Sequence, residues 1–383
     1  MTQDLPLAGI TVVELGDSAS APFGGQILAH LGAEVWKIER PGSGDSARGW
    51  GPSTWRGTGA AWHGLNRGKR SICLDIKDPV QLDTLKGLIL HHADVFLHNL
   101  RPGSIGQYGL DAETLRALKP ELIHAEVGAF GHVGPLNRQP GYDPLMQAFA
   151  GIMSVTGEEG QPPVRAGVSI VDFGSGMWAA LGILAALFRR ERQGQGASVS
   201  GSLLETAIAW MTLNIANYAA DGDKGGRFGS GVGIIVPHRA YTTADGHLIV
   251  SCANDRLFAR LCEALDHPEW AKDERYRTNA SRLANRNAID GLIGDRLAQD
   301  SRAYWAKRLE GYGIPSAPIQ TVDELYHHPQ TRALGMLGKT TEDEIALVRL
   351  PLSFDGQRPP ALAPAQEIGE SDSALDAKLG GKP

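Results

Sequence analysis

The chain has 383 residues, of which 42% are hydrophobic and 21% are charged, and its formal net charge is −6 at neutral pH. A chain of this length can bury a large core and is expected to form two domains. The negative charge argues against a general nucleic-acid-binding protein. The chain has three cysteines, and their spacing fits neither a metal site nor a disulfide framework. Because so few cysteines suit a reducing compartment, a cytoplasmic location is expected.

The first half of the chain alternates predicted strands and helices. It begins without the basic and apolar segments of a signal peptide. Apolar runs and turn residues predict strands at 9–15, 35–39, 71–76, 94–98 and 122–127, and helices at 25–31, 79–92 and 111–118. This alternation predicts an α/β fold with a doubly wound parallel sheet, in which ligands lie beyond the carboxyl ends of the strands.

The most apolar helix is predicted after residue 168. Its run Met177–Phe188 is apolar on every side, so the helix should be buried, and the run is too short to span a bilayer. Asp172 at the head of this helix would face free backbone N–H groups and the positive end of the helix dipole. Gly174 and Gly176 leave room for something to approach the backbone. Position alone fits a carboxylate nucleophile and an ordinary N-cap equally well.

A smaller α+β unit is predicted in the second half. A short strand and a helix lie within 198–218, and a hairpin with Asp245-Gly246 as its turn is predicted at 240–251. Helices follow at about 255–266, 284–299 and 301–312, and the proline-rich remainder is expected to return to the first domain. The predicted organisation is a large domain at 1–200, a linker helix at 201–225, a small domain at 226–312 and a return segment at 313–383.

Cationic residues gather at the ends of the predicted strands. Arg40 and Arg48 follow one strand, Arg101 follows another, and Lys77 ends a third. Several cations at one sheet edge suit a polyphosphate, although surface loops carry such residues in any protein. Neither a P-loop nor the dinucleotide-binding glycine fingerprint is present, so an NTPase or a standard dinucleotide enzyme is not expected.

Two other residues have alternative interpretations. Ser18 in Gly16-Asp17-Ser18 resembles the nucleophile block of GDS-type serine hydrolases, but the nearest Asp–His pair, within 323–327, has the wrong spacing. Asp143 is either a second carboxylate near Asp172 or a cap of its own helix, which the following proline favours.

Ordered blocks over nearly the whole chain carry a family resemblance. They are 6–15, 37–45, 66–75, 93–103, 141–157, 241–246, 282–286 and 313–319. With these blocks the chain resembles the class III coenzyme A transferases of the CaiB/BaiF superfamily, typified by formyl-CoA and carnitine CoA-transferases. The resemblance implies a Rossmann-like large domain with a smaller α+β domain, two interlocked rings forming a homodimer, and acyl-CoA and small carboxylic acids as substrates with no permanently bound cofactor.

The resemblance also implies a covalent mechanism. The aspartate of the family's Asp-x-x-x-Gly block falls on Asp172, which would form a mixed anhydride with the acyl group and then an aspartyl-CoA thioester. Backbone amides after Asp172 are candidate oxyanion donors. The glycine-rich lid of the family corresponds to Gly229, Gly231 and Gly233, whose alternative interpretation is a flexible linker.

The family's CoA contacts fall on a further set of positions, namely Arg40, Leu74, Lys77, Asn99, Arg101 and Tyr142. Arg48, His63 and His238 are candidates for steering the acid substrate. The chain departs from formyl-CoA transferase at Asp17, Ala19, Gln107 and Pro140, so its phosphate contacts and its acid specificity are expected to differ.

The related α-methylacyl-CoA racemases share this fold and this CoA site. Their general base is a histidine at the position of Tyr142, and a phenol with an ordinary pKa of about 10 is a poor base near neutral pH. The sequence therefore favours a transferase, with a racemase-like isomerase as the first alternative, the serine hydrolase as the second and a non-catalytic CoA-binding module as the third.

Overall fold

The computed structural model describes residues 5–101 and 103–380. The chain divides into two compact units. The first comprises the described residues within 1–150, 167–213 and 329–383, and the second comprises 151–166 and 214–328.

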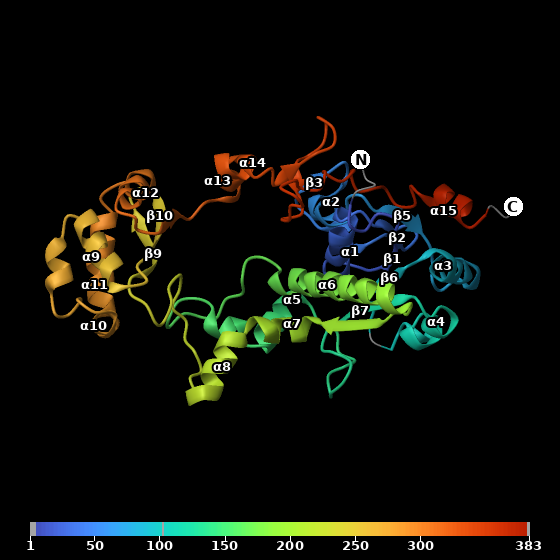
Figure 1. Cartoon of the computed structure of the whole chain (residues 1–383), viewed down its shortest axis with the longest axis horizontal. Coiled ribbons are helices and arrows are strands. Elements are labelled where there is room, and N and C mark those ends of the chain that lie inside the picture. Colours follow the sequence, from blue (N-terminus) through green and yellow to red (C-terminus); the bar gives the residue numbers. More distant parts are fainter. Residues whose placement is uncertain (1–4, 102, 381–383) are drawn as a thin grey trace. The chain divides into compact units, whose positions relative to one another are not determined.

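A six-stranded parallel sheet forms the centre of the first unit (Figure 1), which confirms the predicted sheet. Its strands are β1 (Thr11–Leu15), β2 (Glu34–Glu39), β5 (Arg70–Cys73), β6 (Val95–His98), β7 (Ile123–Gly128) and β8 (Ser198–Ser202). Their order is β5-β2-β1-β6-β7-β8, so the chain direction across the sheet reverses between β1 and β6. In open parallel sheets, the loops after the two strands at such a reversal run in opposite directions, and ligands bind in the crevice between them.

Helices cover both faces of this sheet. On one face α1 (Ser20–His30) and α6 (Ile170–Gln193) pack against the strands and against each other. On the other face α3 (Pro79–His92), α4 (Ala112–Leu118) and α15 (Asp372–Lys378) contribute buried leucines to the core. The unit also contains α2 (Ala60–Asn66), α5 (Asp143–Phe149), α7 (Leu203–Trp210), α14 (Pro329–Ala333) and the ribbons β3–β4 (Thr54–Trp55, Thr58–Gly59) and β12–β13 (Leu337–Gly338, Leu347–Val348).

Helix α6 is longer than its apolar run suggested. It has 24 residues and is long and apolar enough, by length and composition alone, to cross a membrane, which corrects the expectation based on residues 177–188. A packed core helix meets the same criteria, and the buried residues of α6, among them Ala179, Ala180 and Ile183, face the rest of the unit. The expectation that the helix is buried on every side is wrong for the single chain, because Trp178 and Leu181 are exposed.

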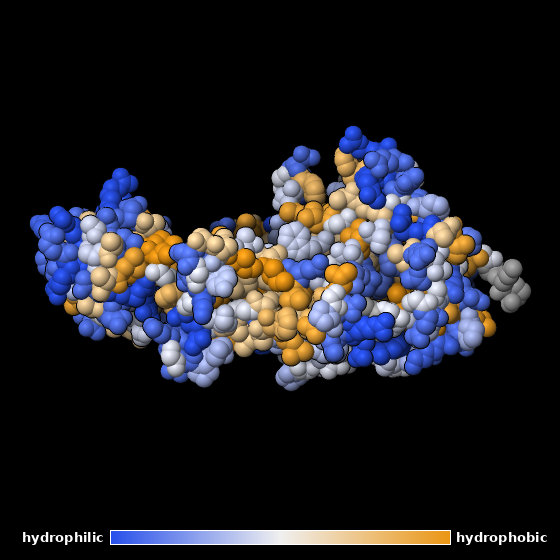
Figure 2. Space-filling view, turned by 90° about the horizontal axis from the view of Figure 1, so that it is seen from below, coloured by the Kyte–Doolittle hydropathy of each residue, from blue (hydrophilic) through white to orange (hydrophobic). Residues whose placement is uncertain are grey.

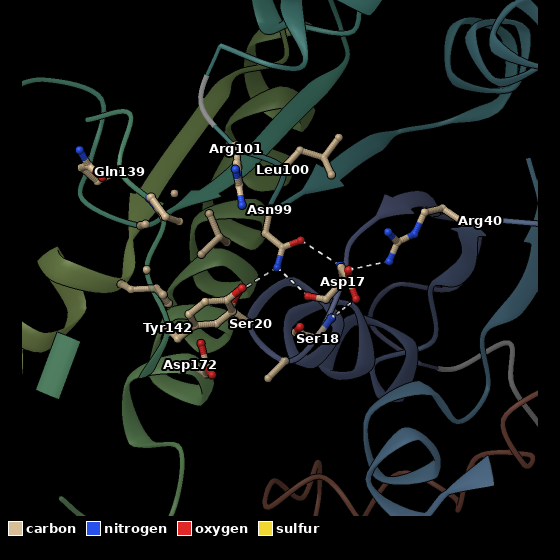
Figure 3. Close-up of a pocket in the computed structure, with 17 residues that line it drawn as sticks. Asp17, Ser18, Ser20, Arg40, Asn99, Leu100, Arg101, Gln139, Tyr142 and Asp172 are labelled. Atoms are coloured by element: carbon tan, nitrogen blue, oxygen red, sulfur yellow. Dashed lines mark hydrogen bonds and ion pairs between the residues drawn. The ribbon is translucent and has the colours of Figure 1, made fainter. Parts of the chain in front are cut away.

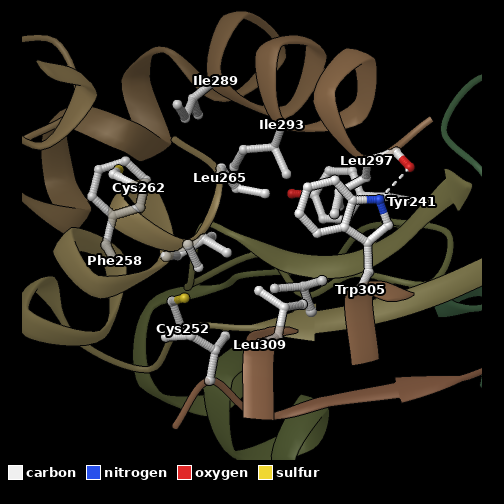
Figure 4. Close-up of a cluster of buried hydrophobic side chains, with 14 of the residues drawn as sticks. Tyr241, Cys252, Phe258, Cys262, Leu265, Ile289, Ile293, Leu297, Trp305 and Leu309 are labelled. Atoms are coloured by element: carbon white, nitrogen blue, oxygen red, sulfur yellow. Dashed lines mark hydrogen bonds between the residues drawn. The ribbon is translucent and has the colours of Figure 1, made fainter. Parts of the chain in front are cut away.

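The second unit is α+β. The hairpin β9 (His238–Thr243) and β10 (Gly246–Ser251) is confirmed, but its two-residue turn is Ala244-Asp245, one position earlier than expected. Strand β11 (Ser316–Pro318) extends this sheet. The helices are α8 (Thr212–Asp221), α9 (Asp255–Ala264), α10 (Asn279–Ala284), α11 (Arg286–Leu297), α12 (Arg302–Gly311) and α13 (Val322–His327). Figure 4 shows their core, where Trp305 is fully buried and its indole N–H donates to the carbonyl of Leu297.

A buried ionic cluster supports the loop after β1. The Glu14 carboxylate lies 2.9 Å from Lys37 Nζ and 2.8 Å from Lys69 Nζ, and all three side chains are almost fully buried. Lys37 also contacts Asp45 at 2.8 Å and donates to the carbonyl of Gly16. Burial lowers the pKa of Lys37, but Glu14 and Asp45 more than offset it, so this pKa ends above its usual range and Lys37 stays charged. These buried contacts hold the start of the loop that follows β1 in place.

Candidate active site

A cavity of about 360 Å³ opens at the carboxyl edge of the parallel sheet (Figure 3). Its walls come from the loops after β1, β2, β6 and β7, from Tyr142 directly before α5, and from residues near the start of α6 and α7. The cavity brings together five of the residues proposed from the sequence, namely Arg40, Asn99, Arg101, Tyr142 and Asp172.

Asp172 is the third residue of α6 and lines the cavity. Burial raises the pKa of this carboxyl to about 7, and the neighbouring Asp143 carboxylate adds to the rise. In the described part of the chain, no hydrogen-bond donor contributes to that pKa. The side chain is therefore a carboxylate of unusual basicity at the edge of a ligand-sized space, which is the property a nucleophile requires.

The N–H groups around Asp172 are not free. The amides of Val171 and Asp172 both donate to Asp143 Oδ2, at 2.8 and 3.3 Å, and the amide of Phe173 donates to the carbonyl of Ser169. The expectation that Asp172 faces free helix-head amides, and that the amide directly after it is an available oxyanion donor, is wrong. Asp143 caps this helix rather than its own. The interpretation of Asp143 as a second carboxylate near Asp172 is therefore confirmed, and the favoured interpretation as a cap of its own helix is wrong.

Asp17 joins three of the loops that form the cavity. Its carboxylate accepts hydrogen bonds from the Ser46 amide at 2.8 Å and the Ser46 hydroxyl at 3.0 Å, and it pairs with Arg40 at 3.1 Å. Its backbone N–H donates to Asn99 Oδ1, while Asn99 Nδ2 donates to its carbonyl. Figure 3 shows Asn99 and Arg40 held on either side of Asp17. Because Arg40 is largely exposed, its guanidinium is anchored by Asp17 and still open to an anion.

The close packing of α1 on α6 sets the position of Asp172. A Cβ atom at Gly176 would lie 2.5 Å from the carbonyl oxygen of Ser20 and 2.9 Å from the amide nitrogen of Gly24. A Cβ at Gly174 would lie 2.6 Å from the ring of Trp210 on α7. The space beside Gly174 and Gly176 is therefore filled by α7 and α1, and it is not open to a ligand as the sequence suggested.

Several proposed residues lie outside the cavity. Leu74 is buried, and Lys77 follows β5 at the edge of the sheet. Arg48 is bound to Glu39 at 2.7 Å and stacks over Trp62, and His63 is buried against the carbonyl of Trp55. These contacts assign Arg48 and His63 to the packing of their own loops and give no support to a role with the acid substrate.

The glycine-rich residues and His238 belong to the second unit. There Arg286 donates to the carbonyls of Val232 and Gly233, and a Cβ at Gly233 would lie 2.8 Å from the ring of Phe228. His238 Nδ1 lies 2.8 Å from Ser251 Oγ. The segment is packed rather than a loose linker, and its role as a lid stays a prediction.

Comparisons with known proteins agree with this geometry. The model of CoA-transferase family III matches residues 7–371. The chain belongs to this family. It is 34% identical to a succinate–glutarate CoA-transferase of Agrobacterium fabrum, over 98% of this chain and 96% of the relative, and 38% identical to a succinyl-CoA–D-citramalate CoA-transferase of Chloroflexus aurantiacus, over 85% and 81%. A crystal structure of a CaiB/BaiF family protein from Brucella suis has a TM-score of 0.91 and 35% identity, covering 98% of this chain and all of that one.

Membership in CoA-transferase family III makes this chain a transferase and leaves the serine hydrolase and the non-catalytic module without support. The departures from the formyl-CoA transferase pattern are concentrated at the site. Asp17, Ala19 and Pro140 line the cavity, whereas Gln107 does not. The lining of the cavity therefore differs from that pattern at three positions.

The packing of Gly176 gives a first prediction. A Gly176→Ala substitution should lower the free energy of unfolding by about 1–3 kcal/mol, because the added methyl group meets the backbone of α1 and cannot be avoided by a side-chain rotation. It should also reduce turnover, since α6 must move at Asp172. Chemical denaturation and steady-state kinetics would measure both effects.

The matched control is Gly87→Ala within α3, where a Cβ would meet nothing within 4 Å. That variant should be as stable as the parent or slightly more stable. Equal behaviour of the two variants would contradict the packing argument.

Proposed function

We propose that this protein transfers CoA from an acyl-CoA donor to a small carboxylic acid, with the Asp172 carboxylate as the nucleophile. The observation that carries the proposal is the placement of this basic carboxylate in a cavity that also holds Arg40, Arg101 and Asn99. Membership in CoA-transferase family III supports the reaction class.

The proposed chemistry proceeds in balanced steps. An Asp172 oxygen attacks the thioester carbonyl, the C–S bond breaks, and CoA leaves as a thiolate from a mixed anhydride. The thiolate then attacks the Asp172 carbonyl, which gives an aspartyl-CoA thioester and releases the donor acid. The acceptor carboxylate attacks this thioester and the same two steps run in reverse, which restores the Asp172 carboxylate.

The cations of the cavity hold the substrate in this proposal. Arg40 and Arg101 bind the phosphates of CoA, and a guanidinium can do so with two parallel hydrogen bonds. Tyr142 is 62% exposed and presents an aromatic face at the mouth of the cavity. Leu74 and Lys77 lie outside the cavity, and we propose that they contact the part of the CoA molecule that extends beyond it.

Dicarboxylic acids are the proposed substrate class. The curated relatives described above are named for succinate, glutarate and D-citramalate, and each of these has two carboxylates. A panel of CoA esters combined with mono- and dicarboxylic acids, analysed by mass spectrometry, tests this assignment. The racemase alternative predicts instead that deuterium from solvent enters an α-carbon when no acceptor acid is present.

A homodimer is also proposed. Large apolar side chains of α6 and α7 are exposed in the single chain, among them Met177 (54%), Trp178 (46%), Leu181 (55%) and Ile208 (45%). Figure 2 shows apolar residues reaching the surface on the face seen from below. Patches of this kind are typical of protein–protein interfaces. The interlocked-ring arrangement and a cytoplasmic location remain part of the same proposal.

Removal of the nucleophile gives the second prediction. Asp172→Asn should lower kcat by more than about 1,000-fold, because an amide cannot form the anhydride. Asp78→Asn, which alters an exposed helix cap on α3, should keep parental activity. Parental kcat in a folded Asp172→Asn variant would contradict the proposed mechanism.

The raised pKa of Asp172 gives the third prediction. Only the deprotonated carboxylate attacks, and its pKa is about 7 rather than 3.8, so most molecules are inactive below neutral pH. The ratio kcat/KM should therefore rise about tenfold per pH unit below 7 and level off above it. A profile that is flat between pH 5 and pH 8 would contradict the assignment.

The exposed apolar face gives the fourth prediction. Leu181→Asp should convert a dimer into a monomer in light-scattering measurements, because a carboxylate in an apolar interface is strongly unfavourable. Leu118→Asp, at an exposed leucine of α4, should leave the dimer intact. A monomeric parent protein would overturn the dimer proposal.

A further inference from the structure

Asp143 is an almost fully buried carboxylate with an unusual set of partners. It is the first residue of α5 and only 2% exposed. Its Oδ2 atom accepts hydrogen bonds from the backbone amides of Val171 and Asp172, and its Oδ1 atom accepts one from Gln147 Nε2 at 2.5 Å. The residue that precedes α6, Ser169, makes no side-chain cap. The first turn of α6 is therefore capped from another helix.

This cap has an electrostatic consequence for Asp172. The amides at a helix head normally stabilise a nearby carboxylate anion, but here two of them are directed to Asp143. Asp143 also places a second negative charge beside Asp172. Burial is the larger cause of the raised pKa of Asp172, and the Asp143 charge adds to it. The amides bound to Asp143 are not available to stabilise the Asp172 anion.

The other ionisable groups on elements packed against α6 do not share this role. They are His30 on α1, His124 and Glu126 on β7, and Glu205 on α7. Glu205 is hydrogen-bonded to Ser202, and among all these groups only Asp143 changes the pKa of Asp172. The cavity cations Arg40 and Arg101 do not contribute to it either.

We infer that Asp143 is a positioning residue that holds the first turn of α6 through two backbone amides and places a second carboxylate beside Asp172. The inference deepens the proposed function and rests on it for its chemical meaning. A more basic carboxylate is a stronger nucleophile toward a thioester, and the fixed first turn directs it into the cavity. Asp143 does not touch the substrate in this account.

Two substitutions separate the two effects. In Asp143→Asn the amide oxygen can still accept the Val171 N–H, so the cap remains while the negative charge is lost. In Asp143→Ala both the cap and the charge are lost. Asp111→Asn is the matched control, because Asp111 caps the first turn of α4 through the Thr114 amide.

The titration of Asp172 can be followed without any turnover. A water-soluble carbodiimide with an amine partner couples to protonated carboxyl groups, and peptide mass spectrometry gives the fraction modified at Asp172 at each pH. Half-maximal labelling is expected near pH 7 in the parent protein and in Asp111→Asn. In Asp143→Asn the midpoint should fall by about one pH unit or more.

The kinetic result should follow the same pattern. The acid limb of kcat/KM should move to lower pH in Asp143→Asn while turnover at high pH stays within a few-fold of the parent. Asp143→Ala should lose at least about tenfold in kcat at every pH, because the first turn is no longer held. Asp143→Asn could instead keep parental turnover, unlike Asp143→Ala, with the midpoints of labelling and of kcat/KM both at the parental pH. In that case Asp143 is only a structural cap, and the inference about the basicity of Asp172 is overturned.

Other outcomes are equally decisive. A labelling midpoint near pH 4 in the parent protein would overturn the inference even if neither variant folds. Absence of CoA transfer with every acid tested, together with a midpoint near 7 that falls in Asp143→Asn, would refute the proposed function and leave the effect of Asp143 on Asp172 in place.

Discussion

The contact between α1 and α6 is the constraint on which the site depends. Gly24 and Gly176 bring the two helix backbones together, and the rings of Phe23 and Phe173 pack beside them with centroids 4.7 Å apart. Helix α1 begins directly after the loop that carries Asp17, and α6 begins just before Asp172. Because the helices can approach this closely, the end of β1 and the head of α6 form walls of the same cavity.

The carboxylates around this contact have contrasting environments. Glu14 and Asp45 pair with buried lysines, and Asp17 pairs with Arg40 and accepts a hydrogen bond from the Ser46 amide, so these side chains hold loops in place. Among the residues that the structure describes, no cation contributes to the pKa of Asp172, and the Asp143 carboxylate is its neighbour. Burial raises the pKa of Asp172 to about 7, and this is the property on which its proposed role as a nucleophile depends.

Much of the fold follows from sequence because periodic patterns are local. The strands of the large sheet, the Asp172 helix and the hairpin of the second unit were all predicted from short runs of residues, and the ordered blocks predicted the family. The sequence predicts the start of α1 five residues too late, because Ser20–Gly24 contains Pro22 and small residues, which have low helix propensity. The expected domain boundaries stay a prediction.

The site itself could be predicted only in part. Strand ends bring Arg40, Asn99 and Arg101 to one edge, and a sequence pattern can locate strand ends. The cap from Asp143 to the amides of α6 and the pairing of Arg48 with Glu39 depend on how separate elements pack, which no local pattern records. The pattern Tyr142-Asp143-Pro144 favours Asp143 as a cap of its own helix over a second carboxylate near Asp172. The structure confirms the second interpretation, because Asp143 caps the distant helix α6.

The central claim is that Asp172 exchanges an oxygen atom with the substrate acids through an anhydride. The most direct measurement uses an acceptor acid labelled with 18O in its carboxylates, incubated with the enzyme and an acyl-CoA until many turnovers have occurred. When CoA leaves the aspartyl thioester for the acceptor, one labelled oxygen remains on Asp172, so the account predicts 18O in the peptide that contains Asp172 and in no other carboxyl group. Complete transfer of CoA with no label in that peptide would contradict it.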